Sequence, residues 1–272
     1  MEFNQSISLQ NFAKNAKNKN KEKFAKLISI TSGKGGVGKS NFILNLGIAM
    51  SIRGKKVLLI DADMNLSNID ILLGVYPKYT LTNLMDDLIE VEDLLLDGPK
   101  GLKILPASSG NLEVLTNSKR YQRALIQAYN DLRKKFDYIL IDTGAGISDY
   151  SVDFVVNSDK VIIITTPEPT AITDAYAMIK ILFYRISHPD INLVINMVQT
   201  EEEGKNIFNK VNLIVQHFLN KKVNYLGNIM FDHYLQEAVK EQVPILVKRP
   251  RSKSSASIHN VAMMILKGDK KE

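Results

Sequence analysis

The sequence predicts an α/β fold: a doubly wound, mainly parallel sheet with helices on both faces. Three observations support this fold class. Short apolar runs alternate with amphipathic stretches, and several of the runs are apolar throughout, as strands buried on both faces must be. The first run leads through a glycine-rich loop directly into a helical pattern. The composition, with 45% hydrophobic and 24% charged residues in 272, is that of an ordinary globular protein.

Six strands are predicted from the apolar runs. They are Leu27–Ser32, Val57–Ile60, Tyr138–Ile141, Val161–Ile164, Leu193–Ile195 and Val223–Ile229. Helices are predicted between them over residues 41–53, 118–134 and 171–186, and along the stripe formed by Ile207, Val211, Ile214, Val215 and Phe218. Alternating strands and helices of this kind form a parallel sheet with right-handed crossovers. Ligand-binding loops are therefore expected at the carboxyl ends of the strands.

The positive charge lies at the two ends of the chain. The net charge is +6, and residues 1–26 contribute +4 through six Lys against two Glu. Residues 248–272 contribute +5 through seven basic and two acidic side chains, which leaves the middle acidic. An acidic partner, whether lipid headgroup, nucleic acid or protein, would therefore bind at the two ends of the chain. The alternative is that the lysines only keep the protein soluble.

Two absences narrow the function classes. The chain has no Cys, which excludes disulfides, thiolate metal sites and a catalytic thiol. The first ten residues lack the apolar stretch of a signal peptide, and no run approaches the roughly 18 apolar residues of a membrane span. A cytoplasmic location is expected, with peripheral attachment to the inner face of the membrane left open.

The loop GKGGVGKS, Gly33–Ser40, has the residues of a phosphate-binding loop. Its glycines let successive backbone N–H groups face a phosphate at a helix N-terminus, which itself favours negative charge. Lys39 can reach the β and γ phosphates, and the Ser40 hydroxyl can bind Mg²⁺. The alternative is a structural glycine-rich turn. The predicted nucleotide-binding set here is Gly35, Gly36, Val37, Gly38, Lys39, Ser40 and Asn41.

Carboxylates follow two further strands. Asp61 and Asp63 come after the run at Val57–Ile60, and Asp142 comes after Tyr138–Ile141. Carboxylates at strand ends can face the γ-phosphate and its Mg²⁺. The alternative, that each Asp is a helix cap or turn residue, explains three such residues at adjacent strand ends poorly.

The string KGGVGKS, Lys34–Ser40, resembles the deviant Walker A motif of the MinD/ParA ATPases, and the resemblance runs from residue 27 to about 266. It implies a P-loop NTPase that binds ATP and Mg²⁺ and works as an ATP-sandwiched homodimer. Lys34 would reach phosphate in the partner's site, Asp63 would position the attacking water, and Lys39 would complete the catalytic set. Ser40, Asp61 and Asp142 would form the metal site, with Asp142 as the Walker B carboxylate.

The adenine side is expected at Asn196 and Asp232, by the same resemblance. Two departures from the family pattern lie beside them, because Met197 replaces a Lys or Arg and Phe231 replaces a proline. The predicted organisation has three parts: a basic extension with a short amphipathic helix at 1–26, the ATPase domain at 27–266 and a basic tail at 267–272.

The segment TPEPTAITDAYAMIK, Thr166–Lys180, is similar to that of the FlhG branch, MinD-like regulators of flagellar number and placement. Thr170 is expected to cap the helix that follows the PEPT stretch. FlhG proteins carry an N-terminal DQAxxLR motif that binds the GTPase FlhF, and NQSISLQ here matches it at Gln5 and Leu9. Binding to an FlhF-type GTPase, and to flagellar basal-body proteins, is therefore expected. Leu9, Phe12, Ala13 and Ala16 fall at helical spacing and form a small apolar face that could dock on a partner. The alternative is that this face packs on the protein's own core or stays disordered.

The last apolar stripe contains Ile258, Val261, Ala262, Ile265 and Leu266. Core packing is the favoured interpretation, and a membrane-binding helix is the alternative. Two other functions stay open for the whole chain. One is a ParA-like partition ATPase that binds DNA through Lys248, Arg249, Arg251 and Lys253. The other is a MinD-like regulator of the division site.

Overall fold

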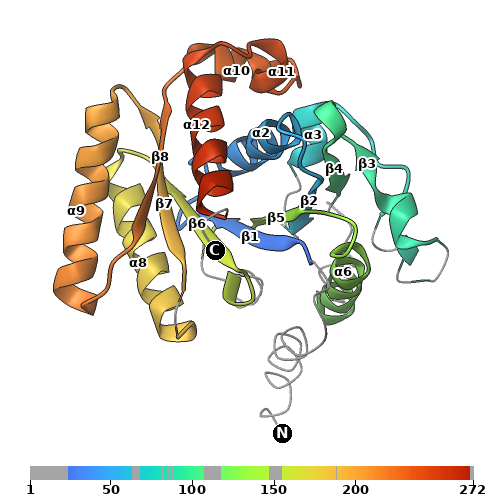
Figure 1. Ribbon diagram of the computed structural model, residues 1–272, viewed down its shortest axis with the longest axis horizontal. Helices are drawn as coiled ribbons and strands as arrows, with labels where there is room; N and C mark the ends of the chain where they lie inside the picture. Colours follow the sequence, from blue (N-terminus) through green and yellow to red (C-terminus); the bar gives the residue numbers. More distant parts are fainter. Residues whose placement is uncertain are drawn as a thin grey trace, which may run out of the picture.

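The structure is a computed structural model, drawn in Figure 1. It describes residues 24–62, 68–80, 83–84, 86, 89–106, 118–146, 155–187 and 189–269. The predicted water-positioning residue Asp63 and the N-terminal residues Gln5 and Leu9 lie outside these ranges.

An eight-stranded sheet forms the centre of the molecule, with strand order β3-β4-β2-β5-β1-β6-β7-β8. All neighbouring strands pair in parallel except β3 and β4. The strands are β1 (Lys26–Thr31), β2 (Val57–Ala62), β3 (Leu96–Asp97), β4 (Lys103–Leu105), β5 (Tyr138–Thr143), β6 (Lys160–Thr165), β7 (Ile191–Val198) and β8 (Asn224–Met230). All six predicted strands are confirmed, and the short pair β3 and β4 was not predicted.

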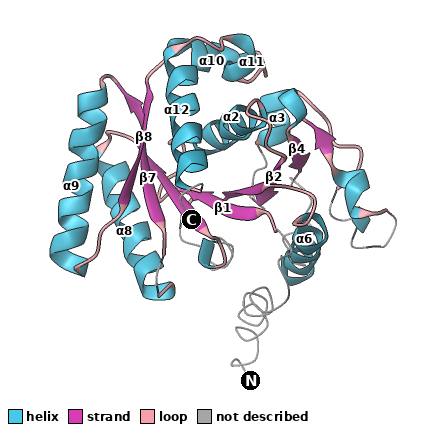
Figure 2. Ribbon diagram, viewed as in Figure 1, coloured by secondary structure: helices cyan, strands magenta, loops and turns pink. Residues whose placement is uncertain are grey.

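Helices cover both faces of this sheet, as Figure 2 shows. The α-helices are α2 (Lys39–Ser51), α3 (Ile69–Leu73), α6 (Ser118–Leu132), α8 (Pro169–Arg185), α9 (Glu201–Leu219), α10 (His233–Lys240), α11 (Ile245–Lys248) and α12 (Lys253–Gly268), with 3₁₀ turns η1 (Val91–Leu94) and η2 (Pro99–Gly101). Successive side chains of a strand point to opposite faces of the sheet. Ile162 packs into a core with α2 and α12, whereas its neighbour Ile163 packs into a core with α8 and α9. The predicted doubly wound fold is confirmed.

The predicted use of the last apolar stripe as core is also confirmed. Helix α12 packs against α2 and β8, and Ile258, Val261, Ala262 and Ile265 are all at most 2% exposed. Leu266 is partly buried against the same core. Among the helices in the described ranges, none is long and apolar enough to cross a bilayer.

The predicted cap at Thr170 is wrong. Helix α8 begins at Pro169, and Glu168 occupies the N-cap position. Proline is favoured at the first helical position because its φ angle already suits a helix and it has no N–H to leave unpaired. Thr170 therefore lies inside the first turn, where its hydroxyl donates to Glu168 Oε1 at 2.8 Å.

Replacement of Ile265 by Ala tests the core assignment of α12. Ile265 is 2% exposed, so Ile265→Ala should lower the free energy of unfolding by about 2–5 kcal/mol through lost burial and a residual cavity. Met264, its neighbour on the same helix, is 53% exposed, and Met264→Ala should change stability by less than about 0.5 kcal/mol. Urea unfolding measures both, and equal values would contradict the assignment.

Candidate functional site

The phosphate-binding loop joins the buried strand β1 to helix α2. Gly38 is the N-cap residue of α2 and has a φ of +86°, a conformation that favours glycine. No side chain caps this helix, and its first turn contains no acidic residue. The first N–H groups of α2 and the positive end of its dipole are therefore suited to an anion.

Two glycines of this loop pack closely against neighbouring elements, and two others face open space. A Cβ atom on Gly33 would lie 2.3 Å from the backbone of Asp174 in α8, and one on Gly38 would lie 2.5 Å from Asn196 Nδ2. These two glycines let the loop approach α8 and β7 closely. A Cβ atom on Gly35 or Gly36 would meet nothing within 4 Å, so the loop is open on that side. A phosphate group fits a loop with this combination of close packing and an open face.

Lys39 and two carboxylates meet at the carboxyl edge of the sheet. Lys39 forms an ion pair with Asp142 Oδ1, and both side chains are buried. Asp61 lies opposite Asp142 in the parallel register of β2 and β5, and its Oδ2 accepts a bond from the backbone N–H of Ile69 at 3.5 Å. Ser40 follows Lys39 in the first turn of α2. The predicted grouping of Lys39, Asp61 and Asp142 is thus present, with oxygen ligands of the kind that Mg²⁺ prefers.

Lys34 lies at the exposed rim of the loop, with 37% of its side chain accessible. Its Nζ atom donates to Glu168 Oε1 at 2.6 Å and to Thr170 Oγ1 at 3.0 Å. The hydrogen bond from Lys34, together with one from Thr170, holds the pKa of Glu168 below its usual value. Lys34 therefore faces the start of α8 and takes no part in the buried cluster around Lys39.

Asn196 lies near the end of β7 and contacts the phosphate-binding loop directly. Its Nδ2 atom donates to the carbonyl of Val37 at 2.8 Å, and its Oδ1 accepts from the N–H of Met197 at 2.9 Å. Beside Gly38 and Asn196 lies a cavity of about 380 Å³, lined mainly by apolar side chains that include Met197, Leu235 and Val239. A cavity of this kind suits a flat heterocyclic base.

Asp232 links two helices through hydrogen bonds. It caps α10 by accepting from the N–H of Tyr234 at 3.1 Å, and its Oδ2 accepts from Ser254 N at 3.1 Å and Ser254 Oγ at 2.9 Å. Burial alone would raise the pKa of Asp232, but these bonds and one from Ser252 hold it below the usual value. The carboxylate joins the start of α10 to the start of α12, and its contact with adenine stays a prediction.

Sequence reasoning missed two features of the site. One is the contact of Lys34 with Glu168 and Thr170, although both residues follow β6 at the same sheet edge and the strand-end rule could have indicated them. The other is the contribution of Leu235 and Val239, which lie on α10. Their cavity depends on how α10 packs, so no local pattern marks it.

The loop, the open helix N-terminus and the buried lysine with two carboxylates define a P-loop nucleotide-binding protein. Residues 23–266 match the ParA family, described as NUBPL iron-transfer P-loop NTPases. The chain belongs to this MinD/ParA family of P-loop ATPases, as its motifs predicted. These 272 residues contain no Cys and so supply no thiolate ligand for an iron–sulfur cluster.

Two relatives and one solved structure are similar to this protein over most of the chain. It is 39% identical to the antiactivator FleN of Pseudomonas aeruginosa, and the matched region covers 88% of this chain and 85% of FleN. It is 33% identical to the flagellum site-determining protein YlxH of Helicobacter pylori, over 89% and 82% of the two chains. Its fold matches that of the septum site-determining protein MinD complexed with Mg-ADP from Pyrococcus horikoshii, with a TM-score of 0.75, 27% identity and coverage of 90% and 98%.

Two glycine substitutions test the packing of the loop. The Cβ atom of Gly33→Ala would lie 2.3 Å from the backbone of Asp174, so the substitution should destabilise the fold by about 1–3 kcal/mol. Gly35→Ala has open space around its Cβ atom and should change stability by less than about 1 kcal/mol. Urea unfolding compares the two variants. A Gly33→Ala protein as stable as Gly35→Ala would contradict the close approach of the loop to α8.

Proposed function

We propose that this chain is an ATP-dependent switch, monomeric without ATP and a homodimer with it, that regulates the number or placement of flagella. The similarity to FleN and YlxH over nearly the whole chain, with the two-lysine loop in place, carries this proposal. The ATPase domain is assigned to residues 27–266, with basic segments at 1–26 and 267–272.

Lys39 would exchange partners when ATP binds. Its ammonium group is paired with Asp142 in a buried cluster, and a triphosphate placed on the loop would bring stronger negative charge to it. Asp142, with Asp61 and the Ser40 hydroxyl, would then be available to Mg²⁺. The metal, when bound, neutralises charge on the β and γ phosphates. The open face at Gly35 and Gly36 leaves the backbone N–H groups of residues 35–41 to hold the phosphates, and the cavity beside Asn196 would hold the base.

Lys34 would act on the partner's nucleotide. Its side chain is 37% accessible, and its bonds within the described part of the chain go to Glu168 and Thr170 at the exposed start of α8, so it can leave them at small cost. In the dimer its ammonium group would neutralise charge that grows on the transferred phosphoryl group in the partner's site. Asp63 would position the attacking water, which completes slow hydrolysis to ADP and phosphate.

The partner assignments are proposals of the same kind. Gln5 and Leu9 would contact an FlhF-type GTPase, and the dimer surface would meet flagellar basal-body proteins. We place the switch in the cytoplasm, with contact at the inner membrane face left as a prediction. DNA binding is disfavoured because two of the four candidate cations are engaged within the protein. Lys248 pairs with Glu241 at 2.5 Å, and the guanidinium of Arg249 lies 5.0 Å from the ring centre of Tyr234.

Deletion of the gene from its own cell tests the biological role. The number or position of flagella, counted by electron microscopy, should change, and the wild-type gene should restore it. Lys34→Ala should fail to restore it because the dimer cannot complete its sites. Lys222→Ala removes an exposed lysine far from the loop and should restore it fully. Melting curves check that both variants fold. Unchanged flagella after deletion, or a loss of DNA partition instead, would overturn the proposal.

A further inference from the structure

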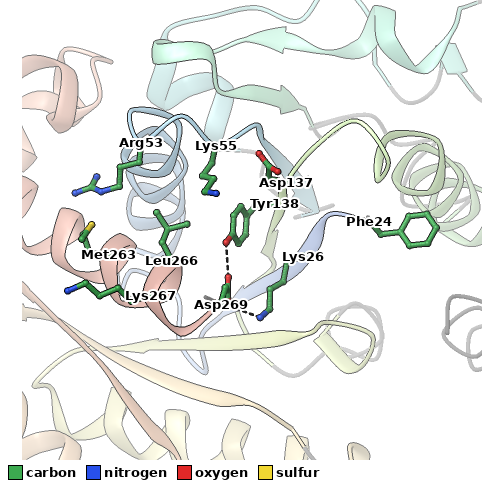
Figure 3. A pocket seen from close by; sticks show the side chains of 10 residues that line it. All are labelled: Phe24, Lys26, Arg53, Lys55, Asp137, Tyr138, Met263, Leu266, Lys267 and Asp269. Carbon is green, nitrogen blue, oxygen red and sulfur yellow. Dashed lines mark hydrogen bonds and ion pairs between the residues drawn. The ribbon is translucent and has the colours of Figure 1, made fainter. Parts of the chain in front are cut away.

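A second cavity lies at the opposite edge of the sheet from the phosphate-binding loop. It has a volume of about 570 Å³ and is formed by the first residues of β1 and β5, the segment before β2 and the end of α12 (Figure 3). The six residues of β1 separate the two edges by roughly 20 Å. A ligand in this cavity would therefore leave the nucleotide loops free.

The carboxylates of this cavity are already engaged. Asp269, just after α12, accepts from Lys26 Nζ at 2.6 Å and from the Tyr138 hydroxyl at 2.8 Å, as Figure 3 shows. Burial raises the pKa of Tyr138, and its bond to Asp269 adds to the effect, so the hydroxyl keeps its proton and donates. Asp137 accepts from the backbone N–H of Lys56 at 3.0 Å. The two bonds to Asp269 fasten the end of α12 to the sheet, and Lys26 neutralises the charge of Asp269.

Three cations around the cavity form no ion pair with any described carboxylate. They are Arg53, Lys55 and Lys267. Arg53 donates to the carbonyl of Ala49 at 2.8 Å and lies 2.8 Å from His259 Nδ1. Burial, and then Arg53 itself, lowers the pKa of His259, which favours the neutral imidazole, so this contact does not compensate the charge of Arg53.

Helix dipoles explain part of this arrangement. Lys267 lies in the last turn of α12, and Arg53, two residues after α2, donates to the carbonyl of Ala49 near the end of that helix, so both cations lie where a helix dipole stabilises positive charge. Lys55 lies beyond α2, and the dipoles do not explain why all three line one hollow. The three cations make the rim of the cavity complementary to an anion.

Apolar side chains also line the cavity. Met263 is 37% exposed, and Leu266 beside it is partly buried. Figure 3 shows both side chains among Arg53, Lys55 and Lys267. Apolar groups in a hollow with a charged rim are typical of sites that take a side chain from a partner.

We propose that this cavity docks an acidic peptide segment of a partner protein. An apolar side chain of the peptide lies on Met263 and Leu266, and its carboxylates pair with Arg53, Lys55 and Lys267. The chain's own residues 14–23 are disfavoured as occupant because they hold five Lys against one Glu. A bilayer is disfavoured because the apolar side chains line a hollow, whereas membrane insertion needs them to project from the surface.

Fluorescence anisotropy with a panel of labelled peptides, in which Asp and Glu flank a Leu, Ile, Phe or Met, tests the proposal on the full chain. Wild type should bind at least one peptide saturably, and Ser in place of the apolar residue should weaken binding. The double variant Lys55→Glu, Lys267→Glu should weaken it about tenfold or more at low salt. The double variant Lys221→Glu, Lys222→Glu makes the same charge change at two exposed positions elsewhere and should leave binding within about twofold.

The position of the peptide is read from methionine methyl resonances. Met263, which lines the cavity, should shift when the peptide is added, whereas the fully buried Met50 should not. Melting curves confirm that the charge variants fold. Three outcomes would overturn the proposal: no saturable binding by wild type, equal binding by the double variant, or binding of phosphatidylglycerol vesicles through these lysines without any peptide binding. Nucleotide turnover is measured separately, so a failed docking site stays distinct from a failed ATPase.

Discussion

The parallel pairing of β1, β2 and β5 is the constraint on which the site depends. β5 lies between β1 and β2, so the three strands deliver the phosphate-binding loop, Asp61 and Asp142 to one edge of the sheet. The buried pair of Lys39 and Asp142 then joins the start of α2 to the end of β5. Since a buried charge without its partner is costly, substitution of either residue alone is expected to destabilise the fold.

The strands that carry the site could be predicted because they are buried on both faces and therefore read as continuous apolar runs. β3 and β4 could not, since two and three residues at the sheet's antiparallel edge are too short to form a pattern. The loop, Asp61, Asp142 and Asn196 were identified from their motifs and strand ends. The bond from Lys34 to Glu168 and the capping role of Asp232 depend on contacts between distant segments, which sequence spacing does not contain.

The two edges of the sheet have different chemistry. The carboxyl edge carries the phosphate-binding loop and its carboxylates, whereas at the opposite edge Lys26 of β1 pairs with Asp269 just after α12. These two residues are 243 positions apart in the sequence, and only the fold places them beside one cavity. The proposed docking cavity is thus distant from the phosphate-binding loop and connected to it through α2, which extends from Lys39 to Ser51, two residues before Arg53.

In the proposed dimer, Lys34 leaves Glu168 and acts in the partner's site. The double variant Lys34→Ala, Asp63→Ala, mixed in about tenfold excess with wild type, tests it, because most wild-type subunits then pair with a partner that lacks the lysine. ATP turnover should fall to about a tenth. The single variant Asp63→Ala still supplies Lys34 and should leave turnover at the wild-type site largely intact. If turnover is unchanged with the double variant, while sedimentation shows that the mixed dimer forms, the lysine acts within its own subunit and the account is contradicted.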